Sequence, residues 1–141
     1  MRRWVSPLLL VAIVFLLWPN SSPAPIIYRP GEGWSYESRG TMGKWRRDRA
    51  KAQLEVAKEA AAKEDWRTVH KAAKRTVHEW PLSDYAPEAQ QLLAQSYEAR
   101  GDDERAFKEY QKLLRYYPQN VDYEEVQKRQ IVIADRFLGG Q

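Results

Sequence analysis

The sequence predicts an all-α fold of stacked helical hairpins, an α-solenoid, which follows an export signal and a short extended segment. From Trp45 onward the composition shifts to Ala, Lys, Glu, Gln and Arg, with apolar residues at helical spacing. One spacing pattern occurs twice, ending first at Pro81 and again at Pro118. An apolar run near the N-terminus follows two arginines and precedes small, turn-forming residues.

Residues 1–24 have the pattern of a secretory signal peptide. Arg2 and Arg3 precede an apolar run over 5–18, and small and turn residues follow it. The run is shorter than the roughly 20 residues that span a bilayer, so a membrane anchor is the weaker alternative. We expect export to the periplasm or cell envelope, with outer-membrane association as an option. The cleavage position stays open because Pro25 would follow the bond after Ala24.

The composition excludes several kinds of chemistry. The chain has no cysteine, which rules out disulfides, thiolate metal sites, cysteine catalysis and a lipid-modified N-terminal cysteine. Without the two arginines of the signal, the 23 basic residues become 21, against 19 acidic residues. A local basic excess over 44–75 could meet anionic lipid headgroups or nucleic acid, but a solvated helix face explains it better. An exported protein rarely meets nucleic acid, and we expect no nucleic-acid partner.

The segment 25–43 is rich in Gly, Pro and aromatic residues and is expected to be extended. Residues 26–29 and 34–37 flank a turn-forming stretch at 30–33, which predicts a short β-hairpin or an extended strand. An isolated hairpin is marginal in water. Its aromatic side chains should therefore pack against the first helix pair or a partner's sheet edge.

Residues 44–138 predict five helices, delimited by local start and stop signals. Acidic residues open several of them, Gly101 and the two prolines end them, and Asp122 with Glu125 resembles a capping box. Ser83 or Asp84 is expected to cap the third helix, with Pro87 in its first turn. The expected helices are 45–63, 65–79, one from this cap to Gly101, 102–116, and one from near Asp122 to Leu138.

The duplicated spacing places small residues where helices cross, aromatics in the gaps, and proline where the chain leaves the helix. It is typical of tetratricopeptide repeats, helix pairs that bind other proteins. The predicted repeats cover about 50–83 and 87–120, with a partial third at 122–138. The repeat-structural residues are Ala57, Val69, Ala73, Pro81, Ala94, Tyr97, Gly101, Ala106, Tyr110 and Pro118.

Pro81 and Pro118 are 37 residues apart, whereas consecutive tetratricopeptide repeats lie about 34 apart. The extra residues fall in the turn at 82–88. With this turn, residues 44–138 resemble the outer membrane assembly lipoprotein BamD-like family, and also a periplasmic coordinator of cell division. The likeness is carried by Trp80-Pro81-x-Ser83-x-Tyr85-Ala86-Pro87-Glu88-Ala89 and by Ala106-x-x-x-Tyr110-x-x-Leu113-x-x-x-Tyr117-Pro118.

The resemblance implies a periplasmic scaffold at the inner face of the outer membrane, whose partners are the β-barrel assembly machinery or client peptides. The missing cysteine implies a soluble or differently tethered variant. The third unit, in which Ile133-Ala134-x-x-Phe137 matches Leu93-Ala94-x-x-Tyr97, stops after its first helix. That helix is apolar on more than one side, so either another helix or protein covers it, or the sequence lacks downstream repeats.

In such repeats the first helix of each pair faces a concave groove, which identifies candidate partner-binding residues. Gln91 and Gln95 could pair with an extended peptide backbone and Lys58 with a carboxylate, although each could also be merely solvated. Carboxylate-clamp repeats use a Lys and Asn set where this chain has Leu54 and Lys58, so that ligand class is disfavoured. The candidates are Lys51, Leu54, Lys58, Glu88, Gln91, Gln95 and Glu98.

No constellation of catalytic or metal-binding residues is apparent. His70 and His78 lie eight residues apart on one helix, about 12 Å along its axis, too far to share a metal without other ligands. We therefore expect a non-enzymatic protein without cofactor or metal. The leading hypothesis is an adaptor for outer-membrane β-barrel assembly. The alternatives are a structural repeat protein that organises the cell wall or division through self-association, and an accessory to a wall hydrolase. The client and the oligomeric state stay open.

Overall fold

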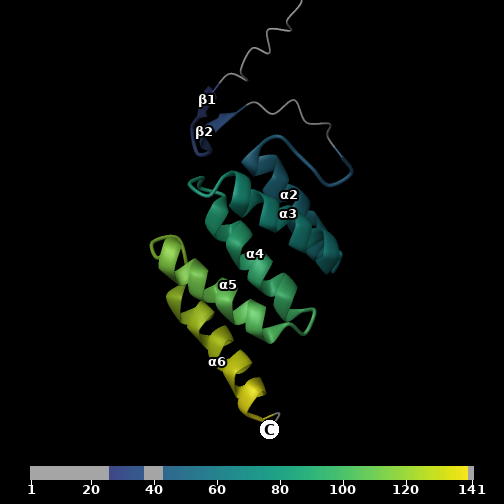
Figure 1. The fold of residues 1–141 in the computed structure, drawn as a ribbon, viewed down its shortest axis with the longest axis vertical. Helices are drawn as coiled ribbons and strands as arrows, with labels where there is room; N and C mark the ends of the chain where they lie inside the picture. The colour runs from purple at the N-terminus through teal and green to yellow at the C-terminus, as the bar shows by residue number, and fades with distance from the viewer. Residues whose placement is uncertain (1–25, 37–42, 140–141) are drawn as a thin grey trace, which may run out of the picture.

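The computed structural model describes residues 26–36 and 43–139 and is mostly helical, as the sequence predicts (Figure 1). The predicted signal peptide at 1–24 and part of the predicted extended segment lie outside the described residues. The described elements are β1 (Ile26–Arg29), β2 (Gly33–Tyr36), α2 (Ala50–Ala62), α3 (Trp66–Glu79), α4 (Ala86–Glu98), α5 (Asp103–Tyr116) and α6 (Tyr123–Gly139).

Each helix packs against the next one in the chain, and α2 also contacts α4. In Figure 1 the helices follow one another down the long axis from α2 to α6, and the β-hairpin lies at the α2 end. None of the helices in the described part of the chain is both long and apolar enough to cross a membrane.

The helices α3 and α5 begin at equivalent caps. The Asp65 carboxylate accepts a hydrogen bond from the Thr68 N–H at 3.1 Å, and the Asp102 carboxylate accepts one from the Arg105 N–H at 3.2 Å. Such caps satisfy N–H groups that have no partner within the helix. Asp122 likewise accepts from two backbone N–H groups in the first turn of α6, at 3.0 and 3.2 Å. These starts agree with the sequence-based boundaries within a residue.

Two of the predicted helix starts are wrong. The first helix begins at Ala50 rather than at 45, because the side chain of Gln53 holds the preceding segment in a non-helical path. The Gln53 amide oxygen accepts from the Arg47 N–H at 2.7 Å, and its amide nitrogen donates to the Trp45 carbonyl at 2.9 Å.

The third predicted helix has neither of its expected caps. The Ser83 hydroxyl donates to the Trp80 carbonyl at 2.8 Å, so it belongs to the turn after α3. The Asp84 N–H donates to the Gly31 carbonyl of the β-hairpin at 2.8 Å. Helix α4 begins at Ala86 with Pro in its first turn, as expected, and its last helical residue is Glu98 rather than one adjoining Gly101.

The predicted β-hairpin is present, and its turn contacts the helices. Ile26 pairs with Tyr36 and Arg29 with Gly33 in an antiparallel register. Two of its aromatic side chains, Tyr28 and Trp34, are 58% and 73% exposed and contact each other, with ring centroids 5.2 Å apart. For these two rings the expected packing against the first helix pair is wrong, because the hairpin docks through its polar turn. Packing against a partner's sheet edge stays a prediction.

The docking residue in that turn is Glu32, which is buried. Its carboxylate accepts from the Lys51 N–H at 3.4 Å and lies 3.6 Å from the Arg49 guanidinium. Within the described residues, α2 has no capping hydrogen bond from its N-cap side chain and no acid in its first turn. Glu32 therefore supplies the negative charge that the positive end of the α2 dipole favours.

The interior consists of two clusters of buried apolar side chains. One lies where α2, α3 and α4 meet, and the other joins α4, α5 and α6 through Tyr110, Leu113, Val126 and Ile133. Helix α6 buries Val126 and Ile133 and leaves other apolar side chains exposed. Its large exposed hydrophobic residues are Tyr123, Ile131, Val132, Phe137 and Leu138.

Candidate partner-binding surfaces

The repeat-structural residues lie at the helix contacts and at the helix ends. Tyr97 is half-buried, Gly101 adopts a left-handed φ of +74°, and Pro81 and Pro118 directly follow the residues that end α3 and α5. A left-handed backbone favours glycine, which accounts for the residue type at 101. The residues with no exposed surface are Ala57, Val69, Ala73, Ala94, Ala106 and Tyr110.

Five of the seven predicted partner-binding residues lie on α2 and α4 with side chains at least partly exposed, and we call the surface that they occupy the α2–α4 face. Lys51, Lys58 and Glu88 are exposed, and Gln91 and Gln95 are half-buried. The Lys58 ammonium lies 3.1 Å from the Glu88 carboxylate and 3.8 Å from that of Glu55. The hydrogen bond to Glu88, followed by the two negative charges, raises the pKa of Lys58. Lys58 and Glu88 therefore neutralise each other across the two helices.

Leu54 is a correction to the sequence-based assignment. It is only 2% exposed, so it belongs to the packed interior and is not available to a partner. Helical spacing alone could not distinguish a buried Leu54 from an exposed one. Leu54 is three residues from Lys51 and four from Lys58, so the spacing places all three on the same side of α2.

Glu98 is the second correction, because its carboxylate is already occupied within the chain. One oxygen accepts from the Arg136 guanidinium at 3.0 Å, and the other accepts from the Tyr110 hydroxyl at 3.0 Å. Arg129 lies 3.6 Å from the same carboxylate. Burial, and next the negative charge of Glu98, raise the pKa of Tyr110 far above its usual value. Glu98 thus attaches α6 to α4 and α5, and with Gln95 it borders a hollow of about 390 Å³.

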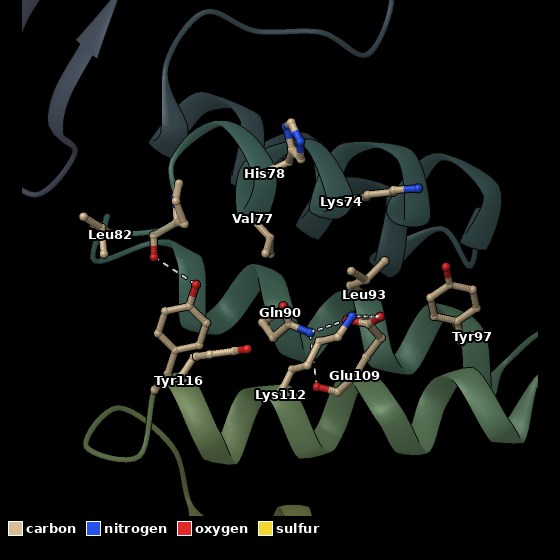
Figure 2. Close-up of a pocket in the computed structure, with 12 residues that line it drawn as sticks. Lys74, Val77, His78, Leu82, Gln90, Leu93, Tyr97, Glu109, Lys112 and Tyr116 are labelled. Carbon is tan, nitrogen blue, oxygen red and sulfur yellow. Dashed lines mark hydrogen bonds and ion pairs between the residues drawn. The ribbon is translucent and has the colours of Figure 1, made fainter.

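A larger hollow, which sequence analysis missed, lies between α3 and α5 with α4 as its floor (Figure 2). Its volume is about 660 Å³, within the range of pockets that hold ligands. Val77 on α3, Leu93 and Tyr97 on α4, and Tyr116 on α5 give it an apolar lining. The signal was absent from the sequence because the two walls come from helices that are not adjacent in the chain.

Hydrogen bonds beside the α3–α5 hollow join α4 to α5 and join the segments that follow α3 and α5. The Gln90 amide donates to the Glu109 carbonyl at 3.1 Å and to the Glu109 carboxylate at 2.7 Å. Lys112 donates to the other oxygen of that carboxylate at 2.8 Å. At the far end the Tyr117 hydroxyl donates to the Pro81 carbonyl at 2.9 Å, and partial burial raises the pKa of Tyr117. In Figure 2 the bond from Gln90 to Glu109 joins α4 to α5, and the bond from Lys112 to Glu109 lies within α5.

The mouth of the α3–α5 hollow combines a cation with exposed apolar groups. Lys74 is exposed and has no hydrogen bond or ion pair among the described residues. Leu82 is 93% exposed and Tyr116 is 64% exposed. Large apolar side chains gathered at the edge of a hollow are typical of binding surfaces.

The histidines are not arranged as a metal site. His70 is half-buried against the Tyr97 ring at 4.8 Å, and the Ser96 hydroxyl lies 3.4 Å from its Nδ1. Burial, and next the positive charges of Arg100 and Lys74, lower the pKa of His70. Over residues 26–36 and 43–139, no group of three or more His, Asp or Glu side chains is placed to hold a metal ion.

Comparison with known proteins does not assign the chain to a family. No protein-family model matches it, and no curated protein matches it either.

Proposed function

We propose that this chain is an exported, non-enzymatic scaffold of the tetratricopeptide type, similar to the BamD-like family, that binds protein segments during outer-membrane β-barrel assembly. The export signal and the repeat pattern of the sequence support this function. The observation that carries it is the equivalence of two consecutive helical hairpins. The first hairpin consists of α2 and α3, and the second consists of α4 and α5.

The equivalence extends to helix ends and buried positions. Helices α3 and α5 each have 14 residues, and their capping residues Asp65 and Asp102 are 37 apart. Their C-cap residues, Trp80 and Tyr117, are both aromatic and have the same separation. Buried Gln53 and Gln90 also differ by 37 residues. Such repetition is the signature of helical repeats, which serve as binding scaffolds.

The partner surface in this proposal is the α2–α4 face. Gln91 and Gln95 lie one turn apart on α4 and each carries both a hydrogen-bond donor and an acceptor. That arrangement suits the alternating N–H and C=O groups of an extended peptide backbone. The partners are the β-barrel assembly machinery or client segments of nascent barrels.

Photo-crosslinking in cells tests this surface. A photoreactive residue placed at Gln95 should crosslink to a component of the barrel assembly machinery or to an outer-membrane protein, because this position faces the bound segment. Gln127, which is exposed on α6, provides the matched control and should give no such product. Products from Gln95 that contain neither class of protein would contradict the proposal.

A second candidate function is self-association in the organisation of the cell wall or division site. The observation that favours it is the number of exposed apolar side chains on α6, since large exposed apolar groups mark interaction surfaces. Light scattering of the purified chain should then give a dimer or larger assembly. The double variant Ile131→Ser, Leu138→Ser should return it to a monomer, and a wild-type monomer would remove this candidate.

A further inference from the structure

The α3–α5 hollow is a site separate from the α2–α4 face. Gln90, Leu93 and Tyr97 follow one another at helical spacing on the side of α4 that forms the floor of the hollow. Gln91 and Gln95 lie about 100° or more around the same helix. A ligand in the hollow therefore does not occupy the face assigned to the proposed function.

The shape of the hollow favours an elongated ligand. Its floor runs from Gln90 to Tyr97, seven residues or about 10 Å along α4, which matches about three residues of extended peptide. At one end of the hollow, the lining residues Leu82 and Tyr116 stay largely exposed. A compact molecule confined to the floor would leave these two side chains in water, whereas a peptide would cover them.

The charge at the hollow favours an acidic ligand. The acid on its lining is Glu109, whose carboxylate is engaged by Gln90 and Lys112. Lys74 has no such partner among the described residues and lies at the mouth. The residual charge that a ligand meets is therefore positive, and complementary charge promotes association and selects partners.

We propose that the α3–α5 hollow is a second binding site, which takes a short acidic segment of a partner protein that carries an aliphatic or aromatic side chain. The apolar side chain enters the hollow against Val77 and Leu93. A neighbouring carboxylate meets Lys74, and the rest of the segment covers Leu82 and Tyr116. The proposal goes beyond the function assigned to the α2–α4 face and does not depend on it.

Fluorescence anisotropy with the full chain tests the site. The probe is a labelled peptide of alternating acidic and apolar residues, Asp-Leu-Asp-Phe-Asp-Leu. Two matched peptides replace every Asp by Lys or every apolar residue by Ser. We expect the probe to bind and the two matched peptides to bind at least roughly tenfold more weakly, because each lacks one of the two required chemistries.

Variants on the surface locate the binding. Lys74→Glu should weaken binding of the probe about fivefold, and Tyr116→Ser about tenfold, through lost charge pairing and lost apolar contact respectively. Lys128→Glu changes an exposed cation on α6, outside the α3–α5 hollow and the α2–α4 face, by the same charge and should leave the affinity unchanged. Circular dichroism checks that each variant is folded.

Three results would overturn the proposal: no binding of the probe, equal binding of the lysine or serine peptide, or equal loss of affinity in Lys128→Glu and Lys74→Glu. The last would mean that the probe senses net charge only. None of these results bears on crosslinking at Gln95, so failure of this site and failure of the proposed function are distinguishable.

Discussion

The two helical hairpins have similar backbones but different interiors. Where α3 has Ala73, α5 has Tyr110, 37 residues later, and both side chains are fully buried. Thr76 and Leu113 differ in the same way. The first hairpin is thus filled largely by small side chains, which let helices approach closely, and the second by larger ones. Equivalent helix ends therefore do not require equivalent cores, because the local caps determine where each helix begins.

The two hairpins also differ in how a further element is attached to them. At the α2 end, the Glu32 carboxylate of the β-hairpin turn meets the start of α2. At the other end, Glu98 contacts two arginines of α6 and the Tyr110 hydroxyl. The first attachment satisfies a helix end, and the second ties a whole helix to the core. We therefore expect the second to contribute more to stability.

The largest effect should come from removing the buried ring of the second hairpin. Tyr110→Ala should lower the free energy of unfolding by about 3–5 kcal/mol, because it leaves a cavity in the cluster that joins α4, α5 and α6. Urea denaturation followed by circular dichroism measures the change. Tyr116→Ala removes an exposed ring from the same helix and should cost under about 0.5 kcal/mol. Equal losses in the two variants would contradict the assigned core.

A smaller effect is expected from Glu98→Ala, which should lower the free energy of unfolding by about 1–3 kcal/mol. The change removes the acceptor of the Tyr110 hydroxyl and one of the carboxylate partners of Arg129 and of Arg136. Amide hydrogen exchange of α6 should accelerate more than that of α2. Glu104→Ala removes an exposed carboxylate from α5 and serves as the control. Unchanged exchange in α6 would show that its apolar contacts alone hold it.

At the α2 end of the molecule, Glu32→Ala should lower the free energy of unfolding by about 0.5–2 kcal/mol, the usual range for losing a helix cap. The loss should appear as faster exchange at the first turn of α2, where the Lys51 N–H loses its acceptor. Glu55→Ala, an exposed change within α2, is the control. If both variants exchange alike at this turn, Glu32 has no capping role.

The smallest effect is confined to alkaline pH. Because the pKa of Tyr110 is raised in the folded chain, its neutral form is favoured there, and the unfolded chain releases this proton from about pH 10 upward. The associated stability is present below about pH 10 and is lost as the pH rises further. Tyr110→Phe cannot release the proton, so its stability should fall less between pH 9 and pH 11 (roughly the window set by a tyrosine hydroxyl). Parallel pH profiles for the two proteins would contradict this.

The helix ends and the β-hairpin could be predicted from the sequence because they depend on residues close together in the chain. The caps at Asp65 and Asp102 and the prolines after α3 and α5 mark helix ends within a few residues of chain, so four of the five helices begin or end close to their predicted positions. A β-hairpin was one of the two conformations predicted for residues 26–37, because turn-forming residues separate its two strands, and the structure has the hairpin.

The misses involve contacts between distant segments. The burial of Leu54, the role of Glu98, and the contact between Asp84 and Gly31 depend on how helices and the β-hairpin approach one another. The α3–α5 hollow is of the same kind, because its floor and both walls come from three different helices. The spacing of apolar residues along the chain does not specify which distant helices or strands come into contact.

The measurement that tests the central claim most directly is affinity purification of the tagged protein from gently solubilised cell envelopes, with identification of the co-purifying proteins by mass spectrometry. A scaffold of the proposed kind should recover the core of the β-barrel assembly machinery. A variant with Lys58, Gln91 and Gln95 all changed to Ala should recover much less of it. Recovery of only the chain itself or of wall enzymes, or equal recovery by the variant, would contradict the adaptor function of the α2–α4 face.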